Sequence, residues 1–115
     1  AAQRPFSSDK EISLKYEFPG GKVNKSETKI NALKRELQEE LNIKVEKFNY
    51  YFNSEHHYKK IRVKLYFYKC KLLKLPAELR VHKSLKLLSL NQLRTVDWLA
   101  GDYAVINQLE NDLKL

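Results

Sequence analysis

The chain has 115 residues, 43% of them hydrophobic, and we expect residues 1–115 to form a single domain with one core. No apolar run approaches the roughly 20 residues that span a bilayer, and no secretory pattern opens the chain, so we expect a soluble, cytoplasmic protein without membrane partners. The net charge of +8 favours an anionic partner, but the basic residues are interleaved with leucines, which favours a solvated surface over dedicated nucleic-acid binding.

The first half of the chain predicts a short strand followed by a helix. Residues 12–18 (ISLKYEF) alternate as a strand does and stop at the PGG turn of residues 19–21. Apolar residues at helical spacing then predict a helix over residues 28–41. Thr28, or Ser26 before it, is suited to the N-cap, and Asn42 is suited to a left-handed helix end.

The second half predicts two long antiparallel strands and a second helix. The strands are expected at residues 43–55 and 58–73, joined by a polar connection at residues 53–57, so that His56 and His57 are loop residues. Cys70, the single cysteine, is predicted to be a buried strand thiol.

The remaining segments complete an α+β layer architecture. Residues 76–84 are expected to form a loop and residues 86–89 a short strand. Residues 102–115 are expected to form an amphipathic helix that Asp102 caps. No internal repeat divides the chain.

Three glutamates crowd one face of the first predicted helix. Glu36, Glu39 and Glu40 are three and four residues apart, and their mutual repulsion should destabilise the helix. A hard cation such as Mg²⁺, which prefers oxygen ligands, would convert this repulsion into affinity. On the helix alone, an ordinary charged surface with ion pairs to Lys34 and Arg35 is the alternative.

The stretch from Gly21 to Ile43, GKVNKSETKINALKRELQEELNI, resembles the signature of the Nudix hydrolases. The residues that match at the required spacing are Gly21, Glu27, Arg35, Glu36, Leu37, Glu39, Glu40 and Ile43. One position departs, because Asn42 stands where the family has glycine; asparagine also tolerates the left-handed conformation, so we expect the turn to survive. AAQRPF, KYEFPGGKV and LNQLRTVDWLAGDYAVINQL resemble further segments of the MutT-like branch.

The resemblance implies an α+β Nudix fold, in which a mixed β-sheet lies between helices. It also implies an enzyme that hydrolyses a nucleoside triphosphate, such as 8-oxo-dGTP, to monophosphate and pyrophosphate with Mg²⁺, or alternatively Mn²⁺. The residues that it implicates in metal binding or catalysis are Gly20, Glu27, Arg35, Glu36, Glu39 and Glu40. Of these, the Gly20 carbonyl is an expected metal ligand, while Glu27 and Arg35 are expected to orient the metal-binding carboxylates.

Four further residues are expected to contact the substrate: Arg4, Phe18, Lys22 and Asp102. Lys22 would approach a phosphate and Arg4 would lie along the nucleotide, although simple exposure explains either residue equally well. Phe18 would supply an aromatic wall and Asp102 a polar group for the base. A helix cap is the alternative role for Asp102.

Two departures from the family pattern leave questions open. Relatives usually begin with a further strand, so either the chain is truncated or its sheet lacks that strand. Val81 precedes His82 where relatives often carry a glutamate, so the general base stays open among Glu39, Glu40 and Glu78. The rival functions are a non-catalytic Nudix module that recognises a base or partner, a hydrolase of another nucleotide such as CTP, and RNA binding through the basic surface.

Overall fold

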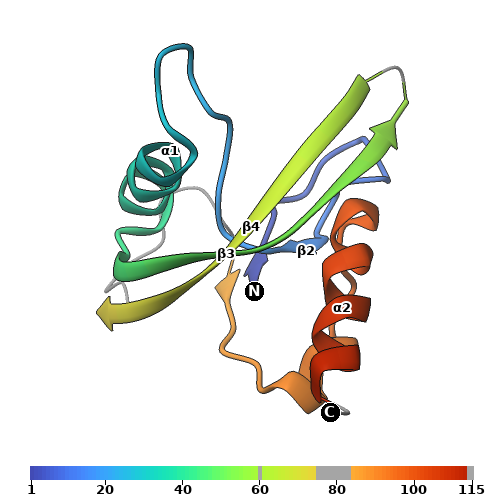
Figure 1. The fold of residues 1–115 in the computed structure, drawn as a ribbon. Coiled ribbons are helices and arrows are strands. Elements are labelled where there is room, and N and C mark those ends of the chain that lie inside the picture. Colours follow the sequence, from blue (N-terminus) through green and yellow to red (C-terminus); the bar gives the residue numbers. More distant parts are fainter. Residues whose placement is uncertain (60, 75–83, 114–115) are drawn as a thin grey trace.

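The computed structural model describes residues 1–59, 61–74 and 84–113, and it contains short strands, one long hairpin and two α-helices (Figure 1). The elements in chain order are β1 (Ala2–Gln3), β2 (Tyr16–Glu17), α1 (Lys29–Glu36), the π-helical turn η1 (Leu37–Leu41), β3 (Lys44–Tyr58), β4 (Ile61–Lys74), β5 (Ser84–Leu85), the 3₁₀ turns η2 (Leu90–Thr95) and η3 (Ala100–Asp102), and α2 (Tyr103–Leu113).

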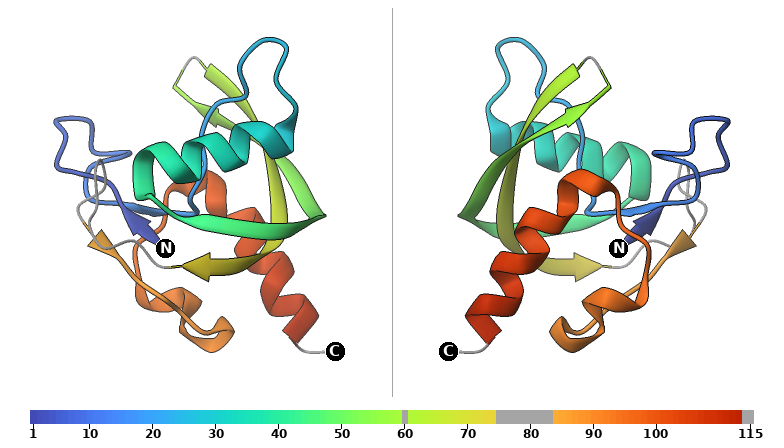
Figure 2. Two further views of the ribbon diagram at one scale, coloured as in Figure 1. Left: turned by 90° about the vertical axis from the view of Figure 1, so that its left-hand side faces the viewer. Right: turned by 90° about the vertical axis from the view of Figure 1, so that its right-hand side faces the viewer.

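The strands form two antiparallel sheets. One sheet has the order β2-β1-β5, and the other is the hairpin of β3 and β4. A parallel bridge between Tyr16 and Trp98 ties β2 to the segment that precedes α2. The long hairpin lies between α1 and α2, as the views from both sides show (Figure 2).

The helical segment made of α1 and η1 begins and ends where local residue chemistry predicts. The Thr28 side chain accepts a hydrogen bond from the Asn31 amide at 3.1 Å, which makes Thr28 the N-cap. Asn42 takes the left-handed conformation, with φ 52° and ψ 42°, at the end of η1. The expected continuous helix is wrong in one respect, because α1 ends at Glu36 and the next turn is π-helical. Such turns occur often at functional sites.

The hairpin differs from the sequence-based expectation in its connection. Tyr58 pairs with Ile61, so the strands are joined by two residues, and the polar residues 53–57 belong to β3. His56 and His57 are therefore strand residues rather than loop residues. Lys59 has a positive φ of 51°, which the tight reversal of the chain requires. In β4 the period-two alternation holds from Arg62 to Phe67, since Val63, Leu65 and Phe67 are half-buried while Arg62, Lys64 and Tyr66 are exposed.

Four other expectations also need correction. The strand predicted at residues 12–18 shrinks to β2, and that predicted at residues 86–89 lies instead at β5. Asp102 belongs to η3 and does not cap α2 through its side chain, which bonds to the Phe18 amide instead. Cys70 lies in β4 as expected but is exposed, because it belongs to the end of the strand, where residues 69–74 are all exposed. The loop predicted at residues 76–84 falls almost wholly outside the described residues.

Two buried clusters hold these elements together. The first contains Ala2, Leu37, Leu41 and Ile43, and it packs the π-helical turn against β1. The second contains Tyr16, Leu93, Trp98 and Ile106, and it anchors the segments that carry Phe18 and Asp102. Full burial of one such side chain contributes about 1.5–3 kcal/mol. Among the described residues, no helix is both long and apolar enough to cross a bilayer.

Candidate active site

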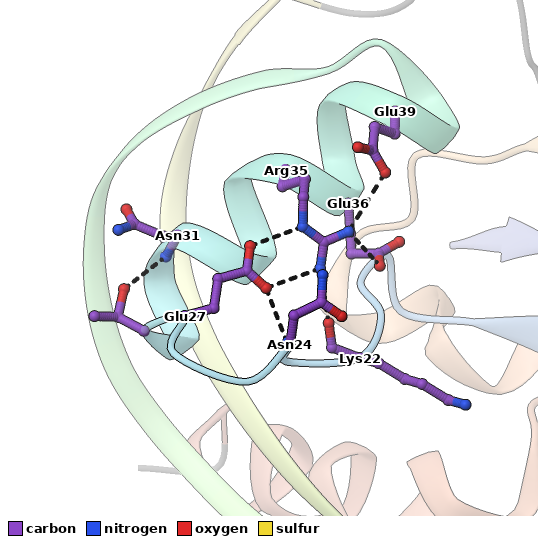
Figure 3. Close-up of polar contacts among 8 residues, drawn as sticks. Lys22, Asn24, Glu27, Asn31, Arg35, Glu36 and Glu39 are labelled. Atoms are coloured by element: carbon purple, nitrogen blue, oxygen red, sulfur yellow. Dashed lines mark hydrogen bonds and ion pairs between the residues drawn. The ribbon is translucent and has the colours of Figure 1, made fainter.

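The guanidinium group of Arg35 binds three glutamates from the first helical segment and the loop before it (Figure 3). Its Nε and Nη2 donate to the two carboxylate oxygens of Glu27 at 2.7 and 3.0 Å. Its Nη1 donates to Glu36 at 2.9 Å and to Glu39 at 3.4 Å, while Nη2 also donates to the Lys22 carbonyl at 2.9 Å. These five hydrogen bonds match the five donors of a guanidinium group. Arg35 therefore ties the loop of residues 22–27 to the helix.

The charges in this cluster stabilise one another. Hydrogen bonds from Arg35 and from the Asn24 amide hold the pKa of Glu27 below its usual value. The carboxylates of Glu27 and Glu36 in turn raise the pKa of Arg35, so the guanidinium stays charged at any working pH. The arrangement accordingly persists from weakly acidic to alkaline conditions.

The turn of residues 19–21, called the glycine loop below, approaches Glu36 so closely that no side chain fits between them. A Cβ built on Gly21 would lie 2.3 Å from Cδ and 2.5 Å from Oε2 of Glu36. Any residue other than glycine would displace the carboxylate, because real Cβ atoms essentially never come within 3.0 Å of such atoms. The position of the Glu36 carboxylate is thus set by Gly21 on one side and by Arg35 on the other.

The donor chemistry at this site suits a hard divalent cation. Glu36 and Glu39 contact the same nitrogen of Arg35, so their carboxylates face a common point. Carboxylate oxygens are the ligands that Mg²⁺ and Mn²⁺ favour. Among the described residues, no three acidic, histidine or cysteine side chains are arranged as a metal-binding group; Glu27, Glu36 and Glu39 are paired with Arg35 instead. Glu40 is half-buried in η1.

A channel of about 1600 Å³ runs beside the glycine loop, between α1 and β4. The sequence-predicted residues that line it together are Arg4, Phe18, Gly20, Lys22, Glu27 and Asp102. Glu36 lies against the wall through its contact with Gly21, whereas Glu39 and Glu40 are not part of the lining. The channel therefore joins the predicted base-binding residues to the loop that covers the carboxylates.

The aromatic and acidic residues predicted for the base lie next to each other. The Phe18 ring stacks on Trp98, with centroids 4.5 Å apart, and meets Phe67 edge-on at 5.9 Å. Asp102 is only 7% exposed, and its Oδ2 accepts a hydrogen bond from the Phe18 amide at 3.2 Å. Burial raises the pKa of Asp102 to about 7; the Phe18 hydrogen bond opposes the shift and the charge of Glu17 adds to it. Asp102 can therefore donate or accept a proton near neutral pH.

The two predicted cations differ in their surroundings. Arg4 is paired with Glu17, with Nη1 and Oε1 3.3 Å apart. Lys22 is exposed, and its side chain extends away from the Arg35 cluster (Figure 3). Arg4 is thus already oriented by a carboxylate, while Lys22 projects into solvent.

Sequence reasoning did not single out Glu17, Trp98 or Tyr58. Glu17 precedes Phe18 directly and could have been noted as a neighbour of the glycine turn. Trp98 and Tyr58 reach this region only through packing, since they lie 80 and 40 residues from Phe18 along the chain. No local signal distinguishes them from other aromatic residues of the core.

Comparisons with known proteins agree with this geometry. The family model described as the NUDIX domain matches residues 1–109. The 8-oxo-dGTP diphosphatase of Buchnera aphidicola subsp. Acyrthosiphon pisum (strain APS) is 40% identical over 98 residues, which cover 84% of this chain and 78% of that protein.

Two solved structures resemble the fold. One is the solution structure of the E. coli ORF135 protein, with a TM-score of 0.71 and 28% identity, which covers 99% of this chain and 78% of that one. The other is the DNA mismatch repair protein MutT (family Nudix hydrolase) from methicillin-resistant Staphylococcus aureus 252, with a TM-score of 0.69 and 35% identity, covering 96% and 85%. These likenesses confirm the predicted α+β fold.

Proposed function

Because the chain belongs to the Nudix family, and is on that ground a pyrophosphohydrolase that uses divalent metal ions, we propose that it hydrolyses a nucleoside triphosphate with Mg²⁺. The proposed products are the nucleoside monophosphate and pyrophosphate. The proposed substrate is an oxidised purine nucleotide, 8-oxo-dGTP, and the name of the relative in Buchnera aphidicola supports this choice.

One observation carries the proposal: Arg35 holds Glu27, Glu36 and the Lys22 carbonyl together beside a channel large enough to admit a nucleotide. A purely structural ion pair would need one carboxylate, whereas Arg35 engages three together with a backbone carbonyl. This extra order fixes Glu27 in the wall of the pocket and Glu36 against Gly21, next to the space that a polyphosphate would occupy. Positioning of that kind is a main source of catalysis in phosphoryl transfer.

The proposed metal-binding groups are the carboxylates of Glu36, Glu39 and Glu40 and the carbonyl of Gly20. A bound Mg²⁺ supplies charge neutralisation of the phosphates and a more acidic water molecule. Glu27 acts through Arg35, because it fixes the guanidinium that in turn orients Glu36 and Glu39.

The bond changes are those of a hydrolysis. The oxygen of a water molecule forms a bond to one of the two phosphorus atoms that share the oxygen between the α- and β-phosphates. The bond from that phosphorus to the shared oxygen breaks, and the shared oxygen leaves with the other phosphate. The proton that water loses passes to a carboxylate, for which Glu39 and Glu40 are the proposed acceptors among the described residues. Arg4 and Lys22 are proposed to meet the phosphates, and Phe18 and Asp102 to hold the base.

A nucleotide panel tests the proposed function. Purified protein is incubated with Mg²⁺ and with 8-oxo-dGTP, dGTP, CTP and other triphosphates, and pyrophosphate release is measured. We expect release to be fastest for 8-oxo-dGTP. Folded protein that releases no pyrophosphate from any nucleotide would refute hydrolysis and favour a base-recognition module.

Matched charge-neutralising variants test the site. Glu40→Gln is expected to lower kcat by about 100-fold or more, because it removes a metal-binding charge from the helix. Glu55→Gln removes the same charge from β3, where Glu55 meets Arg62 and Lys64 at 3.9 and 3.8 Å, and is expected to leave kcat unchanged. Equal activity in the two variants would remove Glu40 from the proposed site.

A further inference from the structure

Tyr58 reaches from the end of β3 to the short turn that carries Asp102. Its hydroxyl oxygen accepts a hydrogen bond from the Gly101 amide at 2.8 Å. The contact is tight, since a Cβ on Gly101 would lie 2.5 Å from that hydroxyl. Gly101 directly precedes Asp102, so the hydroxyl fixes the peptide next to the buried carboxylate.

A few hydrogen bonds hold the turn that carries Asp102. η3 is one 3₁₀ turn of three residues, in which the Asp102 amide bonds to the Leu99 carbonyl at 3.0 Å and the next amide bonds to the Ala100 carbonyl. The Phe18 amide bonds to the Asp102 carboxylate from outside the turn. Turns of this kind have poor hydrogen-bond geometry and depend on their surroundings. The Tyr58 hydroxyl supplies the hydrogen bond from the hairpin to η3.

Packing against His56 fixes the position of the Tyr58 ring. Its ring packs edge-on against His56, with centroids 4.5 Å apart, at the closed end of the hairpin. Burial raises the pKa of Tyr58, the Gly101 hydrogen bond opposes that shift, and the charges of Asp102, Glu17 and Glu11 add to it. The hydroxyl thus stays neutral in the range where Asp102 titrates, and the anchor does not change with pH.

Asp102 has one carboxylate oxygen committed and one available. Oδ2 accepts the Phe18 amide, while Oδ1 has no hydrogen-bond partner among the described residues. Tyr58 and Asp102 both line the channel. A small shift of η3 would move Oδ1 relative to any base bound against Phe18, and hydrogen-bond strength falls steeply with such displacement.

We propose that Tyr58 is a positioning residue for base selection, because its hydroxyl holds the Gly101 amide and so sets where the Asp102 carboxylate meets the base. The inference rests on the proposed function insofar as Asp102 contacts the base. Tyr58 acts through Asp102 and needs no contact with the phosphates.

The experiment compares Tyr58→Phe with a matched control on the same strand. Tyr51 also lies in β3, and its hydroxyl bonds to Asp112 of α2, away from the channel lining. Tyr51→Phe therefore removes a hydroxyl contact between β3 and the C-terminal segment without touching η3. Dissociation constants for 8-oxo-dGMP, dGMP and CMP are measured by titration calorimetry, so that base ranking is obtained without hydrolysis.

Tyr58→Phe is expected to lower the preference for the best monophosphate over the next by about tenfold, the factor that one neutral hydrogen bond corresponds to. Tyr51→Phe is expected to keep the wild-type ranking. An unchanged ranking in Tyr58→Phe, or an equal change in both variants, would overturn the proposal. Failure to bind any monophosphate would overturn it too.

A second readout follows Asp102 directly. The pKa of its carboxyl group is measured by NMR on protein labelled with ¹³C-aspartate. The groups that face Asp102 are Glu17, which is paired with Arg4, the Phe18 amide and Tyr58. Loosening of η3 admits water, so the pKa should fall in Tyr58→Phe and stay at its wild-type value in Tyr51→Phe; an unchanged pKa in both would overturn the proposal.

The two hypotheses fail in different ways. Protein that binds and ranks the monophosphates but releases no pyrophosphate from any triphosphate would refute the proposed hydrolysis and leave the role of Tyr58 standing. Protein that hydrolyses triphosphates with an identical base ranking in wild type and Tyr58→Phe would refute the role of Tyr58 alone.

Discussion

Replacing Gly21 with alanine should damage the site through one misplaced carboxylate. The added Cβ would lie 2.3 Å from Cδ of Glu36, whereas ordinary contacts begin at 3.4 Å. The Glu36 carboxylate must therefore recede by about 1 Å, and a displacement of that size in a reacting site costs roughly 100-fold in rate. We expect kcat/KM for pyrophosphate release to fall by about that factor.

The same change should cost little stability. The atoms that must move are at the far end of a flexible side chain, and an off-rotamer adjustment costs about 0.5–1.5 kcal/mol. Urea unfolding measures the free energy of unfolding for Gly21→Ala, for wild type and for a control, Lys25→Ala, in the same exposed loop. We expect the control to match wild type in both stability and activity.

A double-mutant cycle decides whether Glu36 transmits the effect. If Gly21→Ala acts by moving the Glu36 carboxylate, then it should add almost nothing to Glu36→Gln. Fully additive losses in the double variant would contradict this reasoning, as would a Gly21→Ala enzyme with wild-type kcat/KM.

Three further predictions concern stability. The pKa of Asp102 is about 7 in the folded protein and near its ordinary value when unfolded. Its contribution to the free energy of unfolding is therefore fully present below about pH 4 and is lost as pH rises through 7, by up to about 4 kcal/mol. The free energy of unfolding of Asp102→Asn, relative to that of wild type, should accordingly increase between pH 4 and pH 8. A difference that stays constant over this range would contradict the prediction. Leu41→Ala, at a side chain 1% exposed, should lower the free energy of unfolding by about 2–5 kcal/mol in urea titrations, and a loss below 1 kcal/mol would show that the first cluster repacks. At Asn42, where φ is 52°, substitution by alanine should lower the free energy of unfolding by about 1–2 kcal/mol, and substitution by glycine by much less, as measured by thermal unfolding. Equal losses would mean that the hydrogen bond from Gln38, and not the backbone conformation, favours asparagine at this position.

Local chemistry was enough to predict the ends of the first helix but not the place where the hairpin turns. Thr28 and Asn42 act on atoms within a few residues, so residue type narrowed the cap to Thr28 or Ser26 and indicated the left-handed end at Asn42. Residues 53–57 are polar because much of that part of β3 faces solvent, and polarity alone does not separate an exposed strand from a loop. Lys59 adopts its positive φ without the glycine or asparagine that usually marks such a turn.

In the candidate site, too, contacts between residues close in the sequence could be predicted and contacts between distant residues could not. The spacing of Glu27, Arg35 and Glu36 could be read from the sequence, because these residues interact across one loop and two helical turns. Asp102 allowed two readings, and the partner that distinguishes them, the Phe18 amide, lies 84 residues away. Contacts at that separation depend on how β2 and η3 pack together, which no local pattern encodes.

The exposed thiol of Cys70 makes the channel accessible to labelling chemistry. It is the single cysteine of the chain, and it lines the channel from β4. Partial desolvation raises the pKa of the thiol, so a maleimide dye would attach faster in mildly alkaline buffer than at neutral pH. A fluorophore at this one position would report, by its emission, when a nucleotide displaces water from the channel wall.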